Sequence, residues 1–160
     1  MPREIERKFL VASEAWRDHV SHRVELRDGV IALRDGCKVR VRFYGDAQAT
    51  LSVKGPRAGM SRDEFEYAIP CEDALAMLSK HCDGPPLRKT RHHLVHAGQN
   101  WTIDEYHGAL AGVLIAEIEL ASEDAAFARP AWLGSEVTYD QGYRQSALMR
   151  RHRAALADSA

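Results

Sequence analysis

Acidic side chains recur two residues apart in two short segments of the chain. Glu4 and Glu6 lie near the N-terminus, and Glu117 and Glu119 repeat the spacing far along the chain. Residues two apart on a β-strand project from the same face, so each pair places two carboxylates side by side. Carboxylate oxygens are the ligands that Mg²⁺ and Mn²⁺ prefer in proteins. If both strands face one interior, the four glutamates form a site for such a cation.

Basic side chains show the same spacing in other segments. Lys38, Arg40 and Arg42 alternate with apolar residues, and Lys89 and Arg91 repeat the pattern. Arginine forks match phosphate oxygens in pairs, and lysine adds a point charge. The candidate phosphate-binding side chains are Lys8, Arg40, Arg42, Lys54, Lys89 and Arg91.

One ligand satisfies both groups of charges, namely a polyphosphate bridged to a divalent cation. The alternative is a solvent-exposed sheet face that carries cross-strand ion pairs, each contributing little stability. That alternative is sufficient to explain the charges on any single strand. Some strands, however, are purely acidic and others purely basic, and like charges on one face repel unless an opposite charge lies between them. The segregation therefore favours a bound ion.

The elements that must position these residues follow from apolar periodicity. Alternation with a period of two predicts strands, whereas longer apolar spacing beside capping residues predicts helices. We expect an α+β fold in which a closed barrel turns its charged faces inward to a wet lumen and its apolar faces outward, covered by helices. The predicted strands are 4–11, 37–44, 49–54, 62–69, 101–106 and 114–120, with weaker patterns at 87–95 and 24–33, and the predicted helices are 13–21, 72–82, 122 to about 130, and 145–157.

Composition narrows the classes of function. The chain has 160 residues, is 45% hydrophobic, and balances 22 basic against 23 acidic residues. This length predicts one domain over residues 1–160, and the balance excludes binding to nucleic acid or an anionic membrane by bulk charge. Three dispersed cysteines without a CxxC pair argue against a disulfide framework and against a zinc site built from cysteines. With no signal peptide pattern or apolar run near the ~20 residues that span a bilayer, we expect a cytoplasmic protein.

A series of short motifs runs along the chain in a fixed order. It begins with Glu4-Ile5-Glu6-Arg7-Lys8. The later motifs are Val39-Arg40-Val41-Arg42, Leu51-Ser52-Val53-Lys54-Gly55, Arg62-Asp63-Glu64-Phe65-Glu66, Lys89-Thr90-Arg91, Ile103-Asp104, Glu117-Ile118-Glu119-Leu120 and a final segment from Trp132 to Thr138, before Asp140 and Tyr143. Together they resemble the triphosphate tunnel metalloenzymes, or CYTH superfamily, and look closest to the short bacterial inorganic tripolyphosphatases.

The resemblance implies an eight-stranded antiparallel tunnel barrel that hydrolyses a triphosphate with Mg²⁺ or Mn²⁺. The expected substrate is inorganic tripolyphosphate, cleaved to pyrophosphate and phosphate by a monomer or homodimer. The implied metal ligands are Glu4, Glu6, Glu117 and Glu119, with Glu64 and Asp104 as further candidates. The implied catalytic residues are Lys8, Lys89 and Arg91, and the implied substrate-binding residues are these three with Arg40, Arg42, Lys54, Arg62 and Arg144.

Two positions depart from the pattern of the family. Short bacterial members typically carry a tyrosine after the glycine of the second strand, where this chain has Val30. In some of them that tyrosine and a lysine activate water, so the general base stays open here. Gln145 stands in place of the usual asparagine near the C-terminus, which is an exchange of one amide for another.

Two other functions stay open at this point. One is an enzyme for an organic triphosphate, namely a thiamine triphosphatase, a nucleoside triphosphatase or a class IV adenylate cyclase. The other is a module that binds polyphosphate or nucleotides without turnover. The intact set of four glutamates argues against the module, because an anion binder gains nothing from carboxylates that face its ligand.

Overall fold

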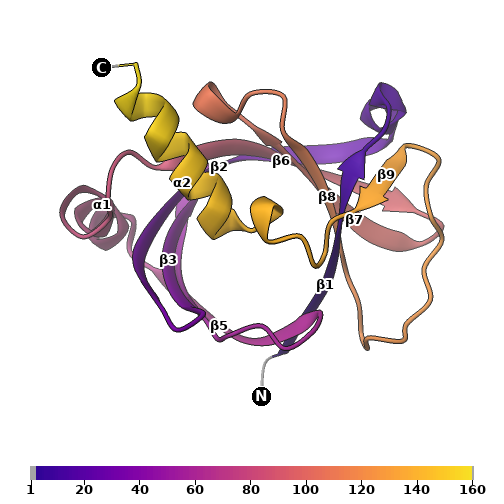
Figure 1. Ribbon diagram of the computed structural model, residues 1–160, viewed down its shortest axis with the longest axis horizontal. Helices are drawn as coiled ribbons and strands as arrows, with labels where there is room; N and C mark the ends of the chain where they lie inside the picture. Colours follow the sequence, from indigo (N-terminus) through magenta and orange to yellow (C-terminus); the bar gives the residue numbers. More distant parts are fainter. Residues whose placement is uncertain (1–2, 160) are drawn as a thin grey trace.

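The computed structural model describes residues 3–159 as a closed antiparallel barrel. Eight strands form the ring in the order β5-β4-β3-β2-β6-β7-β8-β1, and pairing of β1 with β5 closes it (Figure 1). The ring strands are β1 (Arg3–Val11), β2 (Val20–Arg34), β3 (Cys37–Tyr44), β4 (Gln48–Lys54), β5 (Ser61–Ile69), β6 (Leu87–His96), β7 (Gln99–Tyr106) and β8 (Leu114–Glu119). The predicted eight-stranded barrel is thus confirmed.

Strand β1 closes the ring with only its first residues. Glu4 lies opposite Arg62 of β5, whereas from Glu6 onward β1 pairs with β8 on its other edge. A ninth strand, β9 (Leu133–Glu136), occupies the edge that β5 leaves free, where it pairs with Phe9 and Val11. The sequence did not predict β9, because four residues are too short to show a period.

Short helical segments accompany the barrel. They are η1 (Glu14–His19), α1 (Cys71–Lys80), η2 (Gly108–Leu110), η3 (Gln141–Tyr143) and α2 (Gln145–Ala157). The predicted helix at 13–21 is the short 3₁₀ helix η1, which buries Trp16, and Ser13 makes no side-chain cap. Within residues 3–159, none of the helices has the length and apolar character needed to span a bilayer.

The helix predicted from Ser122 to about Pro130 is wrong. This segment contains only bends and a short turn before it runs on without regular structure. The side chain of Gln99 donates to the Ala126 carbonyl and accepts from the Ala128 amide. These tertiary hydrogen bonds satisfy backbone groups that a helix would otherwise pair, and Phe127 packs on the barrel.

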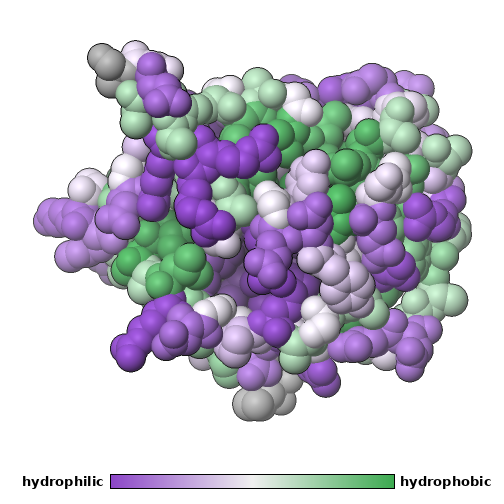
Figure 2. Space-filling view, viewed as in Figure 1, coloured by the Kyte–Doolittle hydropathy of each residue, from purple (hydrophilic) through white to green (hydrophobic). Residues whose placement is uncertain are grey.

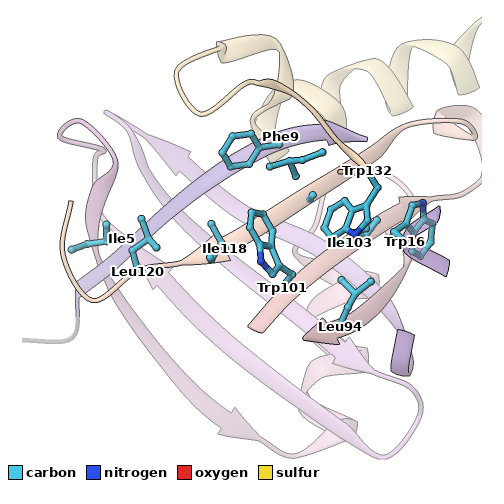
Figure 3. Close-up of a cluster of buried hydrophobic side chains, with 11 residues drawn as sticks. Ile5, Phe9, Trp16, Leu94, Trp101, Ile103, Ile118, Leu120 and Trp132 are labelled. Atoms are coloured by element: carbon cyan, nitrogen blue, oxygen red, sulfur yellow. The ribbon is translucent and has the colours of Figure 1, made fainter. Parts of the chain in front are cut away.

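The apolar strand faces point outward and form the main core. Figure 3 shows Phe9, Trp101 and Trp132 side by side on this outer surface, and the ring centroids of the two tryptophans lie 5.6 Å apart. Two segments cover this side of the barrel. The segment that precedes β9 contributes Phe127 to the cluster, and η1 contributes Trp16. Helix α1 covers β3 and β4 on another side. Irregular segments as well as helices therefore bury the outer faces.

Helix α2 instead reaches across one opening of the barrel (Figure 1). Its buried Leu148 and Met149 pack against Tyr106 and Ile115, whose cross-strand partners are Lys89 and Asp104. Directly paired residues share a face of the sheet, and these partners face the lumen, so α2 packs against the interior of the barrel. The start of α2 is thereby anchored beside the charged lumen.

Replacement of Leu148 tests this anchor. Leu148→Ala should lower the free energy of unfolding by about 2–5 kcal/mol, because the side chain is fully buried and leaves a cavity. Leu156→Ala on the same helix is the matched control, and its 38% exposed side chain should change stability by only about 0.5 kcal/mol. Urea denaturation measures both; equal effects would contradict the packing of α2 into the barrel.

Candidate active site

A cavity of about 590 Å³ lies inside the barrel. Figure 2 shows hydrophilic residues gathered over its opening. Ten basic side chains line it against six acidic ones, so the cavity favours a polyanion. The acidic residues are Glu4, Glu6, Glu64, Glu66, Glu117 and Glu119, and the basic ones are Lys8, Lys38, Arg40, Arg42, Lys54, Arg57, Arg62, Lys89, Arg91 and Arg144.

The pleat of the strands explains why these charges gather in the lumen. On β3, Arg40 and Arg42 line the cavity, whereas Val41 and Phe43 between and after them join the core under α1. The predicted acidic pairs lie on the neighbouring strands β1 and β8, where Glu6 is the cross-strand partner of Glu119. In the ring, β3 lies on the far side from β1 and β8.

Basic side chains neutralise the two N-terminal glutamates. Glu4 accepts hydrogen bonds from Lys54 Nζ at 2.9 Å and from Arg62 Nε. Although burial opposes ionisation, Lys54 and Arg62 hold the pKa of Glu4 well below its ordinary value. Glu6 accepts from Arg57 and lies 3.2 Å from Lys8 Nζ. Both carboxylates therefore have basic partners inside the cavity.

Glu117 is a second site of charge pairing. It accepts from Lys8 and from Arg91, and the distance to Arg91 Nη2 is 3.1 Å. Burial opposes ionisation here too, but Lys8 and then Arg91 hold its pKa well below the ordinary range. Glu117 thus joins the acidic strand β8 to the basic strand β6.

Glu119 differs from the other carboxylates. Within residues 3–159 it makes no ion pair, although Glu4 and Glu6 are close enough to act on it. Burial and then repulsion by these two glutamates raise the pKa of Glu119. This corner of the cavity therefore holds negative charge that a cation would stabilise.

Asp104 was predicted as a further metal candidate; it points into the barrel, but it is fully buried beneath Lys89 and Arg91 and does not line the cavity. Its carboxylate accepts from Lys89 Nζ at 2.5 Å and takes two hydrogen bonds from Arg91, at 2.7 and 2.8 Å. Burial opposes ionisation, yet Arg91 and Lys89 lower the pKa of Asp104 to about 2. Burial lowers the pKa of Lys89 to about 8. Asp104 therefore orients two basic side chains toward the lumen.

Asp28 plays the same role on another strand and was missed by the sequence reasoning. It is fully buried and accepts two hydrogen bonds from Arg42, at 2.6 and 2.8 Å, and one from Gln145 Nε2 at 2.5 Å. Only the register between β2 and β3, which places Asp28 opposite Arg42, could have indicated this pair.

The remaining predicted residues all line the cavity, and three further charged residues join them. Glu64 contacts Lys54 Nζ at 2.8 Å, and Arg144 lies at the N-cap of α2. Lys38, Arg57 and Glu66 line the cavity without having been predicted as site residues. The alternation of β3 already places Lys38 on the face of Arg40, whereas Arg57 lies in a loop without such a signal. Val30 packs in the apolar cluster beneath α2.

The carboxylates that line the cavity are candidate ligands for a divalent cation. Within residues 3–159, no three acidic, histidine or cysteine side chains already lie close enough to hold one metal ion, since lysines and arginines occupy most of the carboxylates. Carboxylate oxygens nevertheless suit Mg²⁺ or Mn²⁺, and Glu119, which lies near Glu4 and Glu6, makes no ion pair with a basic residue in the described part of the chain. A cation would take the place of their basic partners.

Comparison with known proteins identifies the family. The sequence pattern described as the CYTH domain matches residues 2–152. The chain belongs to the CYTH domain family. Two CYTH relatives are named inorganic triphosphatase. The one from Acetivibrio thermocellus is 40% identical over 150 residues, which cover 94% of this chain and 95% of that protein. The one from Nitrosomonas europaea is 38% identical over 150 residues, with 91% and 95% covered.

Solved structures agree with this membership. The crystal structure of an inorganic triphosphatase superposes with a TM-score of 0.65 at 36% identity, over 91% of this chain and 96% of that one. A putative adenylate cyclase from Bacillus halodurans superposes with a TM-score of 0.56 at 17% identity, over 77% and 84%. The second likeness shows the CYTH fold alone.

The ion-paired triad of Asp104, Lys89 and Arg91 predicts a defined dependence of stability on pH. Asp104→Asn should lower the free energy of unfolding at pH 7 by about 3–5 kcal/mol, because it removes the counter-charge that Lys89 and Arg91 share and leaves them only Asp28 and Glu117. Folding lowers the pKa of Asp104 from 3.8 to about 2, so its stabilising effect is present above pH 3.8 and is lost as the pH falls toward 2.

The deficit of Asp104→Asn relative to the parent protein should therefore shrink between about pH 4 and pH 2. Denaturant titrations across this range measure it, with Asp63→Asn on the exposed surface of β5 as control. A deficit that stays constant down to pH 2 would show that Asp104 is not the group that titrates.

Proposed function

We propose that this CYTH protein is a divalent-metal-dependent hydrolase that cleaves inorganic tripolyphosphate to pyrophosphate and phosphate. The observation that carries the proposal is one cavity lined both by an excess of basic side chains and by the carboxylates of β1 and β8. The relatives named inorganic triphosphatase, at 38–40% identity over nearly the whole chain, support the same substrate.

The charge pairing inside the cavity explains why a metal-bound triphosphate suits it. The glutamates of β1 and the basic side chains around them neutralise one another. A metal–triphosphate complex carries both kinds of charge, so its cation replaces the basic partners of the carboxylates. Its phosphates then bind the lysines and arginines that are released. Binding thus exchanges charge partners without leaving a buried charge alone.

We infer that Glu4, Glu6, Glu117 and Glu119 hold Mg²⁺ or Mn²⁺, with Glu64 as an additional ligand. Asp104 has no place in this set, because it lies behind Lys89 and Arg91. A cation held in this way neutralises phosphate charge and lowers the pKa of a bound water.

The basic side chains bind and orient the triphosphate. Lys8 and Arg91 contact Glu117, and Asp104 fixes both Arg91 and Lys89. We assign these three basic residues to charge stabilisation at the phosphoryl group that is transferred. Arg40, Arg42, Lys54, Arg62 and Arg144 hold the rest of the chain of phosphates. In-line attack on a terminal phosphoryl needs mainly positioning and charge, which this set supplies.

Further properties belong to the same proposal. Residues 1–160 form one domain that acts on a small molecule in the cytoplasm, as a monomer or homodimer, without a nucleic-acid or membrane partner. The net charge of -1 and three free cysteines support this setting.

Replacement of the glutamates of β8 tests the proposal. Glu119→Gln and Glu117→Gln should each reduce tripolyphosphate turnover by at least about a hundredfold at saturating Mg²⁺ or Mn²⁺, because the amide is a poor ligand for either cation. Release of phosphate and pyrophosphate measures turnover. Glu72→Gln is the control, because Glu72 lies at an exposed position in the first turn of α1. Near-normal turnover of either variant would show that the metal assignment is wrong.

A panel of substrates tests the choice of tripolyphosphate. The protein is incubated with tripolyphosphate, ATP, GTP and thiamine triphosphate, and phosphate, pyrophosphate and cyclic nucleotide are measured. We expect the highest kcat/KM with tripolyphosphate. Binding of tripolyphosphate without turnover of any compound would instead favour a binding module.

A further inference from the structure

Lys38 differs from the other lysines of the cavity in its partners. Lys8, Lys54 and Lys89 each contact at least one carboxylate. Lys38 has no carboxylate within 4.0 Å among the described residues, although only 6% of it is exposed. Its hydrogen-bond partner is the neutral Oε1 of Gln145 at 2.5 Å. Lys38 is therefore a buried lysine of the cavity that has no counter-charge among residues 3–159.

Gln145 cannot turn its amide to improve this pairing. Its Nε2 donates to Asp28, and the ionised carboxylate of Asp28 accepts hydrogen bonds but donates none. The Oε1 atom therefore faces Lys38, and it also receives Arg40 Nη1 at 3.5 Å. Gln145 is fixed as a neutral acceptor between two cations.

Arg40 adds a second unsatisfied donor at the same place. It lies two residues beyond Lys38 on the same face of β3, and its buried Nε has no hydrogen-bond partner within the described part of the chain. A buried donor without a partner is destabilising, so this atom also favours an anion.

The start of α2 faces the same part of the cavity. Arg144, Gln145 and Ser146 line the cavity, and the helix begins without a side-chain cap. Helix N-termini present free backbone N–H groups and a positive dipole end to an anion. Three features, namely Lys38, Arg40 Nε and the first turn of α2, thus converge on one place.

Burial and neighbouring cations have the largest effects on the pKa of Lys38, although Glu64 and Glu66 also line the cavity. Burial, followed by Arg40 on its own strand, Arg62 of β5, Lys54 of β4 and Lys8 of β1, holds the pKa of Lys38 well below 10.5. From α2, Gln145 contributes no charge and Arg144 contributes a positive one. A bound anion would therefore stabilise the charge of Lys38 more than its neutral partner Gln145 does.

We propose that Lys38, Arg40 and the first turn of α2 form a phosphate subsite, in which one phosphate of the substrate replaces Gln145 as the partner of Lys38. This inference rests on the proposed triphosphatase function and assigns a residue to it that the motifs of the sequence did not. It also explains why a lysine without a counter-charge is kept in the barrel. The subsite fixes the phosphate that lies against α2.

The test uses tripolyphosphate binding in buffer with EDTA, where turnover does not interfere. Lys38→Met should weaken binding by about tenfold to a hundredfold, the usual range for loss of a charge-assisted hydrogen bond. Lys80→Met, at the exposed end of α1, should bind as the parent protein does. Lys38→Met should also unfold at the same temperature as the parent or higher, because it removes a buried charge without a counter-charge.

Proton uptake separates binding from a merely structural role. A phosphate beside Lys38 raises its pKa, so binding should take up a proton at pH values between the pKa of Lys38 without phosphate and that with phosphate. Calorimetry in two buffers with different ionisation enthalpies measures this uptake, which should fall in Lys38→Met. The affinity of the parent protein should decrease with rising pH in the same window.

The outcomes distinguish this inference from the proposed function. If the parent binds tripolyphosphate and Lys38→Met binds it equally well, the subsite is wrong and the triphosphatase proposal stands. Weaker binding that accompanies a lower unfolding temperature would also overturn the subsite. If the parent neither binds nor hydrolyses tripolyphosphate with any metal, the proposed function itself fails.

Discussion

The need to compensate charges inside a small barrel determines much of this structure. The lumen holds sixteen charged side chains, and an ionised group taken out of water is costly unless an opposite charge accompanies it. The protein meets this need with ion pairs between strands that are distant in sequence, such as Glu4 with Lys54 and Arg91 with Asp104. The ring of strands brings these partners together, because its closure leaves every inward face within reach of the others.

The same constraint separates two layers of acidic groups. Asp28 and Asp104 are fully buried beneath the basic side chains of the lumen, and each accepts two hydrogen bonds from one arginine. They set the direction of the basic side chains. The glutamates of β1 and β8 line the cavity itself, and we propose that they bind a cation from solution. Under this proposal the acidic residues of one lumen have two roles: some orient basic side chains of the protein, and others bind a metal ion.

Local periodicity accounts for what the sequence predicted well. A strand with one apolar face shows its period whatever lies beside it, so 37–44 was predicted with the bounds that β3 has. The same alternation placed Glu4, Glu6, Glu117 and Glu119 on inward faces before any register was known. Features that depend on contacts between distant segments could not be predicted from this alternation. The pairing of Asp28 needs the register of β2 with β3, and the hydrogen bonds of Gln99 replaced a helix that composition favoured.

Exchange of charge partners is the central claim of this account, and crystallography tests it most directly. Crystals are grown with Mn²⁺ and an imido-bridged tripolyphosphate analogue that resists hydrolysis, and anomalous scattering locates the manganese. Mn²⁺ should bind oxygens of Glu119 and its neighbours on β1, and Lys54 and Arg62 should turn from Glu4 to the phosphates. Manganese bound elsewhere, or Glu4 still paired with both basic side chains beside the bound analogue, would contradict it.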